Sequence, residues 1–267
     1  GIVLKNDQQL IGEGTSDSDL QGATGVSVPP FTPLLPSING PKPTISATSV
    51  GVTLATNSTV RGLNVSTSGG TGISGTAVGA LHLNDVDSVS SSGAKALDIS
   101  GGSAVMAVDI GSITVTASSV GGVSLTNNAG STTTLGNVSL TTTGGTGFLA
   151  SSSGTVNLGG AASTIASTAG TSLESVNTTI GGSGWTFASI SNDQGTSGGD
   201  TPAIVLTNTG TGTFTVNGGT IENITDVDGI RLSNTDGLVT LANVTVEDIA
   251  ASTDATDPIR TRSFVDG

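Results

Sequence analysis

The sequence of 267 residues contains no cysteine and no tyrosine, and it has only one tryptophan and one histidine. The absence of cysteine excludes a disulfide framework and thiolate metal sites. Only 10% of the residues are charged, and 7 Lys and Arg against 20 Asp and Glu leave a net charge of −13. Because this charge repels the phosphates of nucleic acids and anionic lipid surfaces, we expect no nucleic acid partner.

Long apolar segments are also missing. No run approaches the ~20 apolar residues that a membrane-spanning helix needs, so we expect no membrane insertion by this segment. Gly1 opens no signal peptide, and we expect a mature chain or a piece of a longer protein. An acidic, lysine-poor surface without thiols is typical of extracellular proteins, so we predict a secreted or cell-surface location.

The sequence is rich instead in glycine, with 41 residues, and in Ser and Thr, between which Val, Ile and Leu recur regularly. One pattern recurs most clearly as Leu241-Ala242-Asn243-Val244-Thr245-Val246, in which a bend residue separates apolar positions. Earlier copies begin at Val60, Leu83, Ile110 and Leu135, and weaker ones at Leu158, Ile180 and Val216. The copies step by roughly 22 to 27 positions, with one longer step, which predicts stacked repeats.

A second pattern, a glycine followed by two alternating apolar residues, lies between copies of the first. Examples are Gly51-Val52-Thr53-Leu54, Gly122-Val123-Ser124-Leu125 and Gly229-Ile230-Arg231-Leu232. Each repeat therefore reads as three short strands, which bury an aliphatic face only when copies stack above and below at about 4.8 Å. The prediction is an all-β, single-domain parallel β-helix of about nine coils, a rod of ~40 to 45 Å.

The bend residue of each coil is small or polar. We expect these positions to tolerate a left-handed or bridging backbone, and stacked asparagines to hydrogen-bond along the axis. The bend positions are Gly62, Asp85, Ser112, Asn137, Gly160, Gly182 and Asn243.

The chain divides into a repetitive body with irregular additions. Residues 1–14 form the expected first coil, and 15–41, which hold five of the eight prolines, a protruding loop. Regular coils occupy 42–249, interrupted by an insertion at 191–200 that projects from one face, and 250–267 form an irregular tail. Because neither end offers a capping helix, we expect a longer protein or self-association through the end rungs.

The opening segments Ile2-Val3-Leu4 and Gln9-Leu10-Ile11-Gly12-Glu13-Gly14, with the coils as far as Ile249, resemble right-handed parallel β-helix proteins of the pectin-lyase-like superfamily. The form they resemble is that of bacterial autotransporter-like and adhesin-like surface proteins. The resemblance implies a right-handed coil and a non-catalytic stalk or adhesive module, with glycans or the surface of a host or neighbouring cell as partners. The same superfamily also contains polysaccharide lyases and hydrolases.

Catalytic residues are not evident. The hydrolases of this superfamily carry Asn-Thr-Asp, Asp-Asp, Gly-His-Gly and Arg-Ile-Lys segments, and only Asn234-Thr235-Asp236 resembles one of them. The lyases combine calcium with arginine, and here Arg61 and Arg231 are far apart in sequence. We therefore predict no enzyme, with a polysaccharide lyase or hydrolase that has an acidic, Ca²⁺-dependent site as the alternative.

His82 and Trp185 each allow a functional and a structural interpretation. His82, between Leu81 and Leu83, is either a general base or an ordinary outward strand residue. Trp185 is either a sugar-stacking platform or a core plug, with the core favoured. Asp193 and Asp200 of the insertion are candidate contact residues.

We expect no resident cofactor apart from a possible calcium ion. Asp226, Asp228 and Asp236 alternate with other residues and offer the oxygen ligands that Ca²⁺ prefers, although ordinary turn residues are favoured. The segment Asn84-Asp85-Val86-Asp87 is a weaker candidate of the same kind.

Thr-x-Thr pairs such as Thr114-Val115-Thr116 and Thr213-Phe214-Thr215 suggest ice binding. An ice-matching face needs identical rungs, and the variable length of the coils argues against it.

Overall fold

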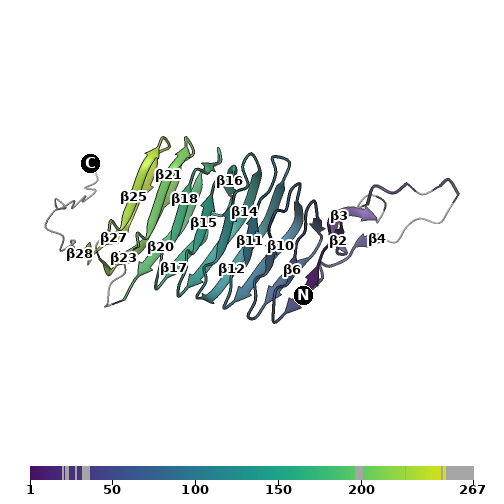
Figure 1. Ribbon diagram of the computed structural model, residues 1–267, viewed down its shortest axis with the longest axis horizontal. Coiled ribbons are helices and arrows are strands. Elements are labelled where there is room, and N and C mark those ends of the chain that lie inside the picture. Colours follow the sequence, from purple (N-terminus) through teal and green to yellow (C-terminus); the bar gives the residue numbers. More distant parts are fainter. Residues whose placement is uncertain are drawn as a thin grey trace.

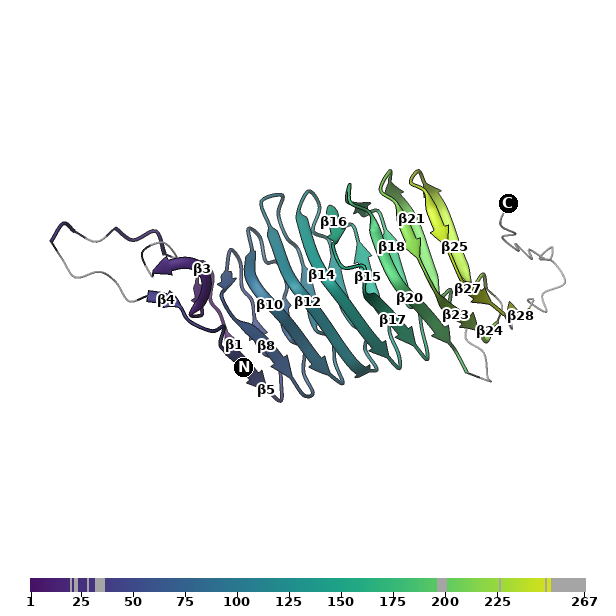
Figure 2. The same cartoon turned by 180° about the vertical axis from the view of Figure 1, so that it is seen from behind.

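The computed structural model describes residues 1–19, 21, 24–27, 29–31, 37–195, 201–225, 227–247 and 249–250. Apart from the helical residues Gln21 and Thr24, the regular elements in these ranges are strands. All of them except β3 and β4 stack in parallel as a β-solenoid of about 8 turns (Figures 1 and 2). The predicted fold class is confirmed. No helix in the described part is long and apolar enough to cross a membrane.

The first sheet consists of one short strand per coil. Its order is β1 (Ile2–Val3), β6 (Val52–Thr53), β9 (Ile73–Gly75), β11 (Leu97–Ser100), β13 (Val123–Thr126), β15 (Phe148–Ser151), β18 (Leu173–Val176), β21 (Ile204–Gly210) and β25 (Ile230–Thr235). The nine strands enclose about 8 turns, close to the predicted number of about nine coils. Six of the strands directly follow a glycine, as in the glycine-led pattern, and β11, β18 and β21 follow Ala96, Ser172 and Ala203 instead. In the middle strands, the alternating apolar residues point into the core.

The second sheet has fifteen strands and covers the other sides of the coil. It contains β2 (Gln9–Ile11), β5 (Thr44–Ala47), β7 (Thr59–Arg61), β8 (Asn64–Thr67), β10 (His82–Ser92), β12 (Ala107–Ser118), β14 (Thr132–Thr142), β16 (Thr155–Leu158), β17 (Ser163–Ser167), β19 (Thr179–Ile180), β20 (Trp185–Asp193), β22 (Phe214–Val216), β23 (Gly219–Glu222), β26 (Val239–Leu241) and β27 (Val244–Val246). Near the ends of the rod two strands per coil enter this sheet, as predicted. In β10, β12 and β14 the two predicted strands are one.

The predicted bend positions do not all have the same backbone conformation. Gly62, Asp85 and Asn243 have the expected left-handed backbone, with φ of 70°, 56° and 53°. The other positions, Ser112, Asn137, Gly160 and Gly182, have no positive φ, so of the expected left-handed or bridging backbone they do not adopt the left-handed form. Ser112 and Asn137 lie inside the continuous strands β12 and β14, where the backbone stays extended.

A different part of the coil, at the carboxyl ends of the first-sheet strands β18, β21 and β25, holds left-handed asparagines. Nδ2 of Asn208 donates a hydrogen bond to Oδ1 of Asn177 at 2.6 Å, and Nδ2 of Asn234 donates to Oδ1 of Asn208 at 2.7 Å. All three have φ between 50° and 52°. Stacking of asparagine side chains along the axis therefore occurs, at a corner that the bend pattern does not mark.

The core is one continuous aliphatic stack. It runs from Leu4 in the first coil to Ile224 near the last, and most of its members have no exposed surface. At about 25 cal/mol for each Å² of apolar surface removed from water, this burial is the main force that holds the coils together. The rod is thus stabilised along its whole length rather than around one centre.

Two small sheets complete the description. β3 (Gly14–Asp19) pairs antiparallel with β4 (Ser37–Asn39) at the end of the rod beside β2, within the segment predicted to be a loop (Figure 1). β24 (Ile224–Thr225) pairs with β28 (Ile249–Ala250) at the other end. The tail predicted after residue 250 lies outside the described residues.

Candidate functional site

Charged and polar side chains cluster at a β-bulge in β10. Leu83 pairs with Val108 and Val86 with Ile110, so β10 contains one residue more than β12 between these pairs. Asp85, at the bulge, has a left-handed backbone. Bulges bend a strand and redirect its side chains, and they are frequent beside functional sites.

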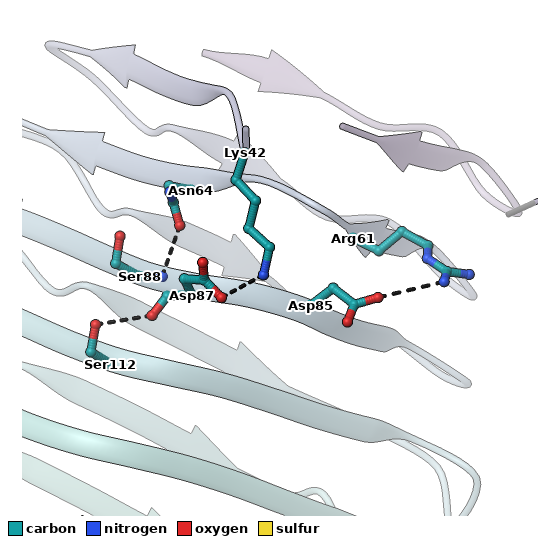
Figure 3. A network of polar contacts seen from close by, with 7 residues as sticks. All are labelled: Lys42, Arg61, Asn64, Asp85, Asp87, Ser88 and Ser112. Atoms are coloured by element: carbon teal, nitrogen blue, oxygen red, sulfur yellow. Dashed lines mark hydrogen bonds and ion pairs between the residues drawn. The ribbon is translucent and has the colours of Figure 1, made fainter. Parts of the chain in front are cut away.

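Both carboxylates at the bulge are paired with a cation from an earlier coil. Nη2 of Arg61 lies 3.5 Å from Oδ2 of Asp85, and these side chains are 15% and 23% exposed (Figure 3). Nζ of Lys42 donates to Oδ1 of Asp87. A calcium ion on the segment 84–87 would have to displace these cations, so the arrangement does not favour it.

Hydrogen bonds to neighbouring coils fix the backbone after the bulge. The amide of Ser88 donates to Oδ1 of Asn64 at 2.9 Å, and Oγ of Ser112 donates to the carbonyl oxygen of Asp87 at 3.0 Å (Figure 3). Three consecutive coils are therefore tied together at this corner.

Next to the bulge, a shallow groove of about 450 Å³ crosses β7, β10, β12 and β14. His82 stands in its middle, opposite Thr59 on one side and Ala107 on the other. The histidine is exposed, whereas Leu81 and Leu83 are fully buried, so its predicted outward direction is confirmed. The other lining residues are Arg61, Leu83, Asn84, Val108, Asp109, Thr132 and Thr134.

The groove brings together groups that are distant in sequence. His82 and Asp109 are exposed on adjacent strands, and Arg61 contributes a guanidinium held by Asp85. Such a surface offers hydrogen bonds to a polar ligand. Asp109 was not among the sequence candidates. Alternation marks it as outward, but only the register places it in the same groove as His82, two residues along β12 from Ala107, the pairing partner of His82.

Two of the three predicted calcium residues, Asp228 and Asp236, lie at opposite ends of one strand. Asp228 and Asp236 are both exposed and lie before and after β25, so roughly 20 Å of extended chain separates them and one ion cannot bind both. Asp226 lies outside the described residues. Within the described ranges, no three His, Asp or Glu side chains are close enough together to hold a metal ion.

Trp185 belongs to the core. Its side chain is fully buried, Nε1 donates to the carbonyl oxygen of Val156 at 2.8 Å, and its ring meets Phe148 edge-on with 5.4 Å between centroids. The sugar-stacking interpretation was wrong for this residue, because no face of the ring reaches solvent.

Part of the predicted insertion is ordinary coil. Asn192 is fully buried in β20, where its Nδ2 donates to the carbonyl oxygen of Gly170 at 2.8 Å. Asp193 ends the strand, and its Oδ1 accepts hydrogen bonds from Nδ2 of Asn223 at 2.8 Å and from the amide of Gly195 at 2.9 Å. These bonds, the Asn223 one first, lower the pKa of Asp193. Asp200 lies outside the described residues.

No protein-family model matches the chain, and comparisons with curated proteins and with solved structures find no match either.

Proposed function

We propose that the chain is a non-catalytic structural and adhesive β-helix module of a secreted or cell-surface bacterial protein. The observation that carries this proposal is the single uninterrupted core from Leu4 to Ile224. A fold whose coils each contact mainly their neighbours resists bending and holds its ends apart. About 8 turns at about 4.8 Å give a rod of roughly 40 Å.

The side chains on the surface support a rod that displays binding surfaces rather than an enzyme. At the bulge, the two acidic side chains are neutralised by Arg61 and Lys42, and surface ion pairs of this kind are ordinary structural contacts. The pectin-lyase-like and autotransporter-like resemblance adds the expectation of display on a cell surface. Partners of an adhesive rod would be glycans or another cell, and self-association through the end rungs would extend it.

The test is to display the chain on a bacterial surface between an anchor and a terminal epitope. Beads coated with antibody to the epitope are then mixed with these cells and with cells whose anchor carries the epitope directly. The expected result is that the cells with the chain capture more beads. Equal bead capture in the two strains would contradict the stalk role. Adhesion of the same cells to glycan-coated surfaces, measured without the antibody, reports separately on the adhesive role.

The groove supports a second candidate, a polysaccharide-active enzyme. It contains the only histidine of the chain beside Asp109 and Arg61, which together provide acid, base and cation. The test is a depolymerisation assay on acidic and neutral polysaccharides, with and without Ca²⁺, that follows reducing ends and unsaturated products. Turnover that is lost in both His82→Ala and Asp109→Asn, but retained in the Thr155→Ala control, would establish this second function.

A further inference from the structure

One side of the second sheet carries short, uncharged side chains on six consecutive coils. We call it the hydroxyl face and define it as eleven outward residues of β8, the second half of β10, β12, β14, β17 and β20, which end at Ser191, before the charged Asp193 that ends β20. These residues are Ser66, Ser90, Ser92, Thr114, Thr116, Ser139, Thr141, Thr164, Ala166, Ser189 and Ser191.

The middle row of the hydroxyl face is in strict register. Each of Ser66, Ser90, Thr114, Ser139, Thr164 and Ser189 is the pairing partner of the next. Oγ of Ser90 donates to Oγ of Ser66 at 3.1 Å across 24 residues, and Oγ1 of Thr164 donates to Oγ of Ser139 at 3.4 Å across 25 residues. The row is therefore a continuous ladder of hydroxyl groups.

The coils differ in length, but these differences do not change the strand register of the hydroxyl face. Among the coils that carry the hydroxyl face, the longest step in the first sheet joins Leu173 to Ile204 and contains the insertion, yet Thr164 and Ser189 of the same part of the rod remain paired. The extra residues follow β20 in the sequence, beyond the strands that form the hydroxyl face. The length argument against an ice-matching face is therefore removed for the hydroxyl face, although Thr213 and Thr215 are not part of it.

The face forms a grid with two repeats. Rungs follow one another at about 4.8 Å along the rod, and outward residues along a strand at about 6.6 Å. The intervening residues, such as Ile113, Val115, Val138 and Leu140, are buried in the core and hold the grid in place. The strands lie side by side along the rod with little change of direction (Figure 2).

The composition of the face restricts what can occupy it. None of its residues is charged, on a chain with a net charge of −13, so it offers nothing to bind a mineral or an ionic ligand. None is aromatic, so it has no platform on which sugars stack. What fits a rigid, neutral, periodic array of hydroxyl and methyl groups is a solid that is itself periodic and hydrogen-bonded. The axial repeat is close to the a-axis repeat of hexagonal ice.

We propose that the hydroxyl face binds ice. This inference rests on the proposed adhesive function, since it names one surface to which the rod would adhere. The two can fail separately, because bead capture reports on the stalk and the freezing assay below reports on the face.

The experiment measures thermal hysteresis, ice-crystal shape and inhibition of ice recrystallisation with the purified chain. The test variant is Thr114→Lys with Ser139→Lys, which places two large charges in the middle row. The matched control is Ala107→Lys with Thr132→Lys, which places the same charges at exposed positions of the same strands, β12 and β14, on the groove side. Circular dichroism and the melting temperature establish that both variants fold.

The expected result is measurable activity for the unmodified chain, a several-fold loss in the test variant and unchanged activity in the control. Absence of activity in the folded, unmodified chain would overturn the proposal, as would an equal loss in both variants. Sedimentation supplies a third outcome: a dimer of the unmodified chain that the test variant alone dissociates would assign the face to a second copy and overturn ice binding.

Discussion

At the scale of single residues, glycine has two distinct roles at the corners of this solenoid. Gly62 supplies a left-handed backbone, with φ of 70°. Gly136 has no positive φ; instead, a Cβ at this position would lie 1.9 Å from the carbonyl oxygen of Gly111 on the preceding coil. Stacked coils approach each other so closely at this corner that no side chain fits between them.

This distinction gives a prediction for paired glycine substitutions. Gly136→Ala should cost roughly 1 to 3 kcal/mol, because two backbones must move apart. Gly182→Ala, at a bend position with nothing within 4 Å of the added Cβ, should be neutral or stabilise by up to about 1 kcal/mol. Urea unfolding of both variants measures the difference. Equal stabilities would show that close approach is not what requires Gly136.

Asp193 gives a prediction for pH. Its folded-state pKa is lowered below 3.8 by the hydrogen bonds from Asn223 and Gly195. A depressed carboxyl pKa stabilises the folded form above the unfolded value, and this contribution is lost as the pH falls through the folded value. The contacts of Asp193 should therefore weaken below about pH 3.8. Asn223→Ala should raise the Asp193 pKa, which carbon-detected NMR titration of the carboxyl measures; an unchanged pKa would contradict this cause.

At the scale of elements, adjacent residues of one strand have opposite tolerance of charge. In β14, Val138 is fully buried whereas Ser139 is exposed. Val138→Asp should destabilise by more than about 4 kcal/mol or unfold the chain, because it buries an unpaired carboxylate. Ser139→Asp should change stability by less than about 0.5 kcal/mol. Thermal unfolding compares the two, and a similar melting temperature for both would contradict the register described for β14.

The strands themselves could be predicted from sequence, because period-two alternation of Val, Ile and Leu with Ser and Thr directly reflects which side is buried. The fusion of two predicted strands into one, as in β10, β12 and β14, could not be predicted from sequence. At Ser112 and Asn137 the same bend residues that turn the chain at Asn243 stay within one strand. Small polar residues permit a bend without requiring it, and the packing of neighbouring coils decides.

The candidate sites show the same limit. The outward direction of His82 follows from its two leucine neighbours, and it was predicted correctly. Its position beside Asp109 depends on the register between β10 and β12, including the bulge, which no local pattern specifies. For Trp185, local composition was compatible with both core and surface, and only the neighbouring coils place Phe148 and Val156 around it.

At the scale of the whole molecule, the repeat makes the rod divisible. Each coil of the middle region contributes the same backbone ladder and a similar slice of core, so the stability of the rod should be close to a sum over coils and their interfaces. A chain of this kind should tolerate the removal of a complete coil, because the coils on either side present equivalent surfaces to each other.

The most direct test of the rod is the removal of residues 123–147. Val123 and Phe148 are pairing partners, so this deletion brings Phe148 onto Leu97 in register. We predict a folded protein that small-angle X-ray scattering finds shorter by about one rung, roughly 5 Å. Deletion of residues 123–135, about half a coil, should prevent folding, because residues 136–147 alone are too few to span a complete turn between the coils on either side. A folded half-coil deletion, or a full-coil deletion that unfolds, would contradict a rod built of stacked, interchangeable coils.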